Sequence, residues 1–219
     1  MSISSIRTGG RKICTTRSKY KVSEPEAGTD AKNECDSNAD TCCLGSNFII
    51  FKMTNRTADV YPYDESYMPL LNVPIVSGAT AYDDPKTGQT SIIVFNESLY
   101  YGKNLGHSLI NPNQIRHFGI DLWDNAYDRN HDLSIEVDDT LNVEMTYEGT
   151  KCQFKSRAPT QEELSTCPHY DMTSKRTWNP SEVQIGSINT QSNQPRSRRI
   201  SNINVRKYEY IDTSTVFST

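Results

Sequence analysis

The sequence predicts a mainly β protein with one or two short helices. Segments rich in β-branched and aromatic residues alternate with strong turn sequences, which is the pattern of antiparallel hairpins. The apolar fraction is only 35%, and Ser, Thr and Asn together exceed a quarter of the 219 residues. We therefore expect one modest core, concentrated in about residues 34–156, between polar ends.

The first elements are predicted from short β-forming runs. Residues 47–53 are apolar and predict a buried strand. Residues 59–69 contain two prolines, which favours an edge or a loop. Residues 73–82 and 90–101 flank Asp-Asp-Pro-Lys-Thr-Gly at 83–88, and this turn chemistry predicts the clearest hairpin of the chain.

A short helix is expected next, because its boundary residues stand at the right spacing. Asn111 is a suitable N-cap, Pro112 occupies the first helical position and Gly119 ends the helix. Alternating apolar residues at 141–147 and again from 152 to 154 predict a second hairpin around the turn Glu148-Gly149.

Composition marks both ends of the chain as polar, basic segments. Residues 1–32 are expected to be a flexible basic arm, and 33–127 to be the main domain. Residues 128–183 form a C-terminal extension that carries the second hairpin, and 184–219 form a polar basic tail.

The net charge of −4 is unevenly distributed. Residues 1–22 hold six cations and no acid, and 186–219 hold five cations and two acids, so 23–185 carry −13. Basic ends can contact nucleic acid. Because no nucleic-acid-binding motif accompanies them, solvated ends are the favoured interpretation.

Cysteine spacing and hydropathy bear on compartment and cofactors. The six cysteines (14, 35, 42, 43, 152 and 167) show no standard zinc-ligand spacing, and the first residues lack a secretory apolar run. We expect buried free thiols in a reducing, intracellular compartment, with no metal and no cofactor. No stretch of 18 apolar residues occurs, so no membrane-spanning helix is expected.

The residues from Glu34 to Gly45 form the most informative stretch. Asp36-Ser37-Asn38-Ala39 places a carboxylate, a hydroxyl and small or turn-forming residues before a predicted buried strand. Backbone N–H groups and a neighbouring hydroxyl can hold a carboxylate in such a turn. An ordinary loop capped by Asp36 is the alternative that this fragment alone leaves open.

The order of motifs resembles that of retropepsin-like aspartic proteases, and more closely the protease segment of copia-type retrotransposon polyproteins. The family motif Asp-Ser/Thr-Gly-Ala is matched at Asp36–Ala39 except at the third position, and Asp36–Cys42 is similar to the Asp-Ser-X-Ala-Asp-Thr-Cys version of that subgroup. Further similar phrases cover about 33–183; they are Val76–Ala81, Val94–Glu97, His107–Ile115, Arg157–Thr160 and Cys167–His169.

The resemblance implies a fold and a mechanism. The fold would be a closed β-barrel or sandwich of retropepsin type with one short helix, over 33–127. Two aspartates share one proton in these enzymes, and one of them activates the attacking water. Asp36 would be the catalytic residue, and Ser37, Asn38 and Ala39 its supporting loop. Because only seven residues follow Asp212, this chain is expected to supply one aspartate and to act as a homodimer.

Two further features are implied by the resemblance. The turn Asp84, Pro85, Lys86, Thr87 and Gly88 is the candidate flap over substrate, and an ordinary exposed turn is the alternative. Leu109-Ile110-Asn111 matches the family's second signature except at its Gly. Asn38 and Asn111 both replace Gly, and we expect Asn to preserve a backbone with positive φ there.

The resulting expectation is an intracellular aspartic endopeptidase that cleaves its own polyprotein, in the cytoplasm or in virus-like particles. The alternative is a catalytically inactive remnant that acts as a dimerisation or binding module. Nucleic-acid binding through the basic ends is a third, weaker interpretation.

Overall fold

The computed structural model describes residues 2–7, 13–17, 30–62, 66–183 and 199–200. Strands dominate these residues, which confirms the predicted mainly β class. The elements are β1 (Ser2–Arg7), β2 (Ile13–Arg17), β3 (Ala31–Cys35), β4 (Cys43–Gly45), β5 (Ile49–Pro62), β6 (Leu70–Asp83), β7 (Thr90–Gly102), β8 (Ser108–Ile110), α1 (Pro112–His117), β9 (Asp121–Trp123), β10 (Ser134–Asp138), β11 (Leu141–Glu144), β12 (Thr146–Glu148), β13 (Lys151–Ser156), α2 (Gln161–Thr166), β14 (His169–Asp171) and β15 (Arg199–Ile200).

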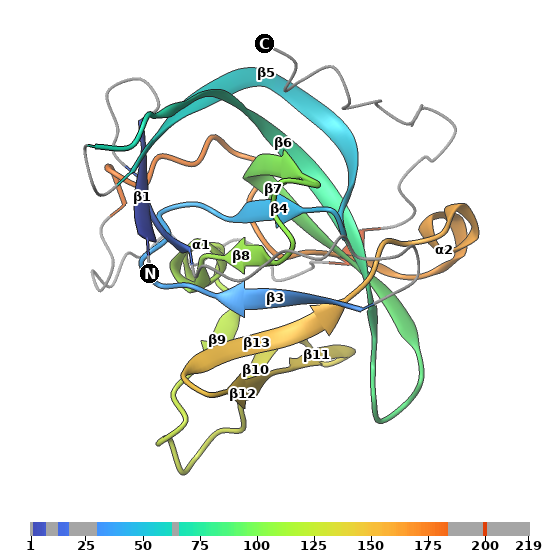
Figure 1. The fold of residues 1–219 in the computed structure, drawn as a ribbon. Coiled ribbons are helices and arrows are strands. Elements are labelled where there is room, and N and C mark those ends of the chain that lie inside the picture. The colour runs from blue at the N-terminus through green and yellow to red at the C-terminus, as the bar shows by residue number, and fades with distance from the viewer. Residues whose placement is uncertain (1, 8–12, 18–29, 63–65, 184–198, 201–219) are drawn as a thin grey trace.

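One large sheet contains twelve of the strands, and its main path runs β12-β13-β3-β8-β4-β7-β6-β5-β1-β2. The long strands β5 and β6 arch over the short strands β3, β4 and β8 (Figure 1). The two end strands, β12 and β2, do not pair with each other, so the described residues form no closed barrel. This corrects the expectation of closure, because β12 pairs only with β13 and β2 pairs only with β1 among the described strands.

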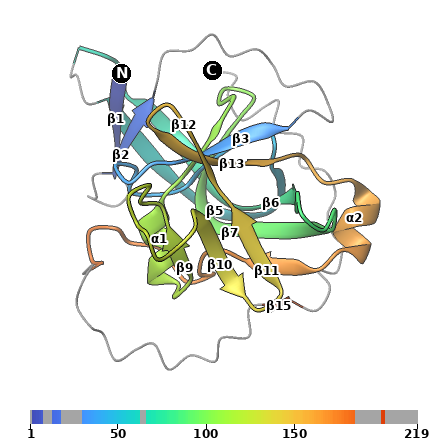
Figure 2. The same ribbon diagram turned by 90° about the horizontal axis from the view of Figure 1, so that it is seen from below.

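A second, three-stranded sheet has the order β11-β10-β9. It lies at the lower end of the molecule in Figure 1 and faces the viewer in Figure 2, which is seen from below. The predicted second hairpin around Glu148-Gly149 is confirmed as β12 and β13, but its first arm is not one strand over 141–147, because the chain changes sheet at Met145. There the Met145 N–H donates to the Leu133 carbonyl at 2.9 Å, outside both sheets. β11 pairs with β10, while β12 returns to the large sheet and pairs with β13.

The predicted hairpin at 73–101 is confirmed as β6 and β7, closed by the pair Asp83 and Thr90. The predicted helix is confirmed as α1, with Asn111 as its N-cap and Pro112 at its start. The prediction that 59–69 is an edge or loop is confirmed at 66–69, which lie outside the strands, and is wrong at 59–62. β5 continues to Pro62 and pairs with both β6 and β1, and a proline at the last position of a strand removes little of the ladder.

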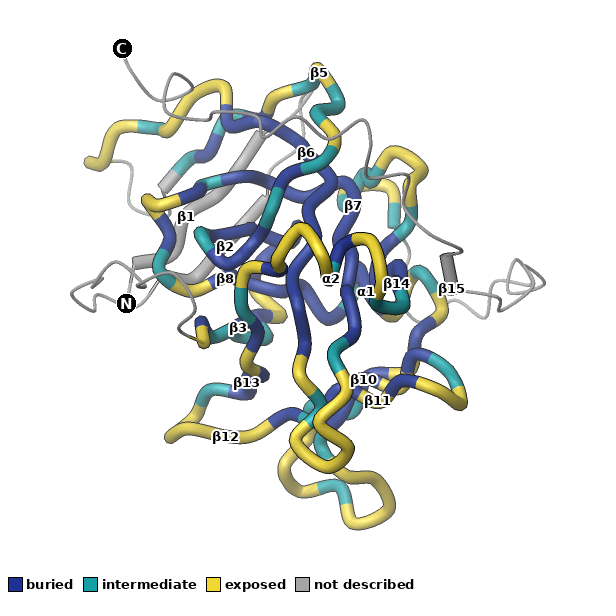
Figure 3. The backbone as a smooth tube through the Cα atoms, turned by 90° about the vertical axis from the view of Figure 1, so that its right-hand side faces the viewer, coloured by how far each residue is buried: buried dark blue, intermediate teal, exposed yellow. Residues whose placement is uncertain are grey.

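The main core lies where the two sheets meet. One cluster of buried side chains includes Phe95 and Ile110 of the large sheet, Ile135 of the small sheet and Phe154 of β13. β7 and the strands beside it are buried along most of their length, and the exposed residues lie at the turns (Figure 3). Residues 128–183 therefore share the core of the preceding segment.

A buried polar network crosses this region. The Asn33 amide donates to Ser156 Oγ at 2.8 Å, and Asn47 donates to both Asn33 Oδ1 (3.0 Å) and Ser156 Oγ (2.9 Å). Ser108 Oγ donates to Asn47 Oδ1 at 2.7 Å, and Thr80 Oγ1 donates to Ser156 Oγ at 2.7 Å. Because buried polar groups are costly when unpaired, this network fixes β3, β6, β8 and β13 in one arrangement.

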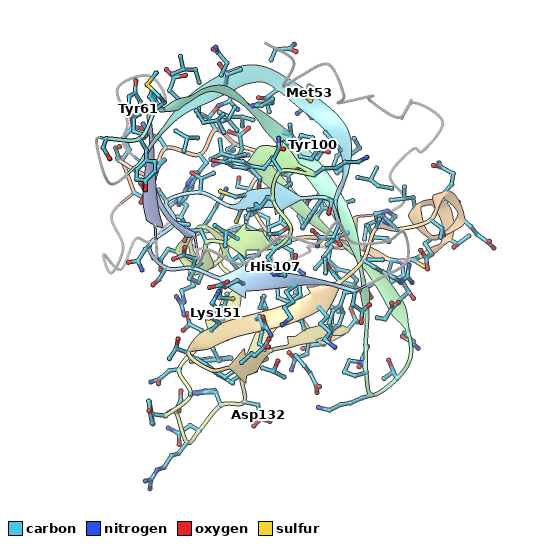
Figure 4. The ribbon with its side chains drawn as sticks, in the orientation of Figure 1. Met53, Tyr61, Tyr100, His107, Asp132 and Lys151 are labelled. Atoms are coloured by element: carbon cyan, nitrogen blue, oxygen red, sulfur yellow. The ribbon has the colours of Figure 1, made fainter. Side chains whose placement is uncertain are left out.

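Charged pairs join β3 to the β12–β13 hairpin at the surface. Lys151 pairs with Glu34 at 2.7 Å, and Lys32 pairs with Glu148. His107 and Lys151 lie close to β3 (Figure 4). Burial, and then the nearby charges of Lys32 and Lys151, lower the pKa of His107, so its ring is largely neutral at pH 7.

The ends of the chain are described only in part. Within the segment predicted to be a flexible arm, β1 and β2 pair with each other and β1 pairs with β5. β3 begins at Ala31, within the last residues of the segment predicted to be a flexible arm. Most of the predicted tail at 184–219 lies outside the described residues. Neither α1 nor α2 is long or apolar enough to cross a lipid bilayer.

Candidate active site

Asp36 follows directly after β3 and begins a tight turn. The Asn38 N–H donates to Asp36 Oδ1 at 2.8 Å, and the Ala39 N–H donates to the Asp36 carbonyl at 3.2 Å. Asp36 is 7% exposed, and Ala39 is buried beside it. Ser37 and Asn38 are exposed at the tip of the turn. The turn therefore fixes the carboxylate through its own backbone and leaves two side chains facing outward.

The predicted second signature lies directly beside this turn. β8 runs parallel to β3 and antiparallel to β4, so it occupies the space between the two strands that the Asp36 turn connects. The Asp36 N–H donates to the Ile110 carbonyl at 2.9 Å. Leu109 is paired with Cys43 at the other end of the loop. Two segments more than seventy residues apart in sequence are thereby brought together.

Asn111 connects this strand to α1. Its side-chain oxygen accepts from the Asn113 N–H at 2.8 Å and from the Gln114 N–H at 3.3 Å. Its own N–H donates to Cys42 Sγ at 3.3 Å. Asn111, which stands where the resemblance leads one to expect Gly, is thus a buried helix cap that also contacts the Asp36 loop.

The expected positive φ is not found at either replaced Gly. Asn111 has φ −77°, and the only non-glycine residues with positive φ among those described are Asn55, Asn72 and Glu97. Asn38 therefore also has negative φ. The physical reason that Asn fits at 111 is its capping side chain rather than a tolerance of left-handed backbone.

Gln114 was missed by the sequence reasoning, although it anchors the far end of the loop. Its Oε1 accepts from the Cys42 N–H at 2.9 Å, and its amide nitrogen lies 3.4 Å from the Asn96 carbonyl and 3.3 Å from the Glu97 carbonyl. Gln114 thus connects α1, the loop and β7. No local signal marks it, because all three partners are distant in sequence.

Trp178 was also missed, and it closes over the outer side of the loop. Its indole N–H donates to the Asp40 carbonyl at 2.8 Å, and its backbone N–H donates to Glu97 Oε2 at 3.1 Å. Its ring lies edge-on to His117, with 5.4 Å between the ring centroids. The C-terminal extension therefore reaches the candidate site and holds Asp40 in place.

Glu97, which accepts the hydrogen bond from the Trp178 backbone, is a buried carboxylate. It is 6% exposed, has φ 52°, and binds Arg56 of β5 through both carboxylate oxygens, at 2.5 and 2.6 Å from Nη2. Strained backbone of this kind persists where the surroundings over-determine it. Glu97 therefore links the β5–β6 hairpin, β7 and the Trp178 segment around the loop.

The two cysteines of the loop are unsuited to be nucleophiles. Burial raises the pKa of Cys42 to about 12 and also raises the pKa of Cys43. Both thiols are therefore protonated at pH 7, whereas a nucleophilic cysteine needs a thiolate. The chemistry that this loop can support is that of a carboxylate.

The candidate flap lies at the other end of β7. Asp83 and Thr90 close its turn, while the Leu99 N–H donates to the Cys42 carbonyl, and nine residues of strand span roughly 30 Å. Lys86 pairs with Glu144 of β11. The structure thus does not bring Asp84–Gly88 together with Asp36 in one chain, and the flap role of this turn stays a prediction.

The β5–β6 hairpin lies nearer to the candidate site. Its residues Ala58, Val60 and Val73 pack in one cluster with Cys43 and Leu109 of the strands that carry the site. Tyr61, near the end of β5, lies at the opposite end of the molecule from Asp132 (Figure 4).

Exposed apolar side chains gather at the end of this hairpin, where the chain enters β6. They are Tyr67, Met68 (88% exposed), Leu70 and Leu71. The sequence reasoning treated this stretch as an edge or loop and missed the cluster, although the run Tyr-Met-Pro-Leu-Leu was its signal.

No protein-family model matches the chain, and comparisons with curated proteins and with solved structures likewise found no match.

Proposed function

We propose that this chain is an aspartic endopeptidase of the retrotransposon type, active as a homodimer. The observation that carries the proposal is the contact between the two predicted motifs. The Asp36 turn and Leu109-Ile110-Asn111 are distant in sequence, yet β8 lies between the two strands that bear the turn. If Asp36 only capped an ordinary loop, nothing would require Leu109-Ile110-Asn111 to lie between the strands that bear the turn.

The pairing of two copies supplies the second carboxylate. Asp36 of each copy faces its symmetry mate, and the pair shares one proton because two ionised carboxylates about 3 Å apart repel strongly. The ionised member takes a proton from water, which attacks the peptide carbonyl, and the protonated member polarises that carbonyl. The exposure of Ser37 and Asn38 supports this pairing, because their side chains are accessible to the turn of a second copy.

The substrate is an extended segment of polypeptide, namely the polyprotein that contains this chain. The apolar end of the β5–β6 hairpin supports binding of apolar substrate side chains, because Met68, Leu70 and Leu71 are exposed on the hairpin that packs against the site strands.

The test is cleavage of a peptide library by the full chain, compared with Asp36→Asn and with the matched control Asp121→Asn, an exposed residue of β9. We expect Asp36→Asn to lose at least about 1,000-fold in kcat/KM, as removal of a catalytic group does, and Asp121→Asn to retain wild-type activity. Equal rates for wild type and Asp36→Asn would refute the proposal. A folded wild-type dimer without cleavage would instead favour the inactive dimerisation module.

A further inference from the structure

Cys35 and Cys152 stand opposite each other beside the candidate site. β3 and β13 are antiparallel, with Glu34 opposite Gln153 and Asn33 opposite Phe154. One further step in the same register places Cys35 opposite Cys152. Directly opposed residues of an antiparallel pair have Cα atoms about 4.5–5.5 Å apart, which lies within the range that a disulfide spans.

The two sulfurs also share a third sulfur neighbour. Met145 Sδ lies 3.5 Å from Cys35 Sγ and 3.9 Å from Cys152 Sγ. Met145 is the residue at which the chain changes from the small sheet to the large one, and it is buried. The side chains of both cysteines therefore point to the same side of the sheet, as a bridge between them requires.

The two thiols differ in exposure and in acidity. Cys35 is partly exposed, whereas Cys152 is 5% exposed. The Cys35 thiol hydrogen-bonds to the Cys152 sulfur, which lowers the pKa of Cys152 and raises that of Cys35. One proton is thus shared by the pair, and the sulfur that carries the negative charge more readily is the buried one.

We propose that Cys35 and Cys152 are a reversible redox modification site, which a small disulfide such as glutathione disulfide converts into an intramolecular disulfide. Cys35 is the more exposed residue of the pair, and it reacts in the minor protonation state in which Cys152 holds the shared proton. The Cys35 thiolate attacks one glutathione sulfur and releases the first glutathione thiolate, which takes the proton from Cys152. The Cys152 thiolate then attacks Cys35 Sγ and releases the second. Two protein thiols are oxidised, one glutathione disulfide is reduced to two thiols, and the two protons end on the glutathione products.

The bond would join the strand that enters the Asp36 turn to the C-terminal extension. Cys35 directly precedes Asp36, and Cys152 belongs to the β12–β13 hairpin. A bond between residues so far apart in sequence restricts the unfolded chain strongly. The proposal goes beyond the endopeptidase function and does not depend on it.

The test equilibrates the folded full chain with glutathione disulfide, blocks the remaining thiols and maps the peptides by mass spectrometry. We expect a peptide pair linked through Cys35 and Cys152, which a reductant separates, and a rise of several degrees in Tm on oxidation. In Cys152→Ser the resolving sulfur is absent, so we expect Cys35 to accumulate the glutathione adduct and Tm not to rise.

Cys167→Ser is the matched control, because Cys167 is also a partly exposed free thiol but lies outside this pair. It should form the 35–152 bond like the wild type. Unreacted thiols, or a stable glutathione adduct on Cys35 in the wild-type chain, would overturn the proposal. The mapping needs no proteolytic activity, so its failure and that of the proposed function are distinguishable.

Discussion

Asn111 combines two structural roles at one position. It caps α1 through its side chain, and its N–H contacts Cys42 on the neighbouring loop. The cap was predictable because its signal is local: Asn111, Pro112 and Gly119 stand in sequence order. The contact with Cys42 was not predictable, because it depends on how β4 and β8 pair.

Loss of this cap gives a prediction at the residue scale. Asn111→Ala leaves the first N–H groups of α1 without their acceptor, so we expect the free energy of unfolding to fall by about 1 kcal/mol. Asn111→Ser supplies an alternative capping oxygen and should retain most of the stability. Urea unfolding of both variants measures this, and equal losses in the two would contradict the capping role.

The roles of Gln114 and Trp178 could not be predicted from the sequence. Both hold the Asp36 loop by hydrogen bonds to backbone groups, at Cys42 and at Asp40 respectively. Every residue type except proline carries the same backbone donor and acceptor, so the residue types at Cys42 and Asp40 do not indicate that a distant side chain binds there. Asp36 could be identified from its own side chain and its neighbours in sequence, whereas Gln114 and Trp178 could not.

At the scale of elements, Arg157 connects β13, the end of β6 and α2. It binds Glu163 at 2.6 Å and Asp83 at 2.7 Å, and Glu163 also completes a capping box with Thr160. Hydrogen bonding from Arg157 lowers the pKa of Glu163 to about 2, from an ordinary value of 4.5.

This shift predicts how stability depends on pH. A carboxyl whose pKa is lower in the folded chain stabilises it above pH 4.5, and that contribution is lost as the pH falls toward 2. Because the pair is partly exposed to solvent, we expect Glu163→Gln to cost only about 1 kcal/mol at pH 7, and less at pH 3.

Urea midpoints of wild type and Glu163→Gln at both pH values measure the effect. Glu162→Gln on the same helix turn is the control and should change stability little, because Glu162 faces solvent. A cost of Glu163→Gln that stays constant from pH 7 to pH 3 would contradict an ionic contribution.

The elements most easily predicted were those defined by local pattern. The β6–β7 hairpin and α1 follow from turn and cap residues that are adjacent in sequence. The break at Met145 and the continuation of β5 to Pro62 were missed, because each depends on a partner strand elsewhere in the chain. Tertiary pairing overrode the local signal in both cases.

At the scale of the whole molecule, the C-terminal extension and the preceding segment share one core. Ile135 of the small sheet belongs to the same buried cluster as Phe95 and Ile110 of the large sheet. The expected division at residue 128 therefore does not separate two hydrophobic cores.

A shared core predicts one cooperative unfolding transition. Ile135→Val removes one buried methylene and should cost about 1 kcal/mol. We expect this loss to shift the entire urea transition, followed both by far-UV circular dichroism and by Trp178 and Trp123 fluorescence. Two separable transitions, of which the substitution shifts only one, would show that the extension folds on its own.

The shared active site is the central claim, and mixing wild type with Asp36→Asn at constant total protein tests it most directly. If each site needs Asp36 from two copies, only dimers of two wild-type chains are active, so activity falls as the square of the wild-type fraction. An equal mixture, once the chains have exchanged, should retain about one quarter of the wild-type rate. Retention of about one half, a linear dependence, would contradict an active site built from two copies of Asp36.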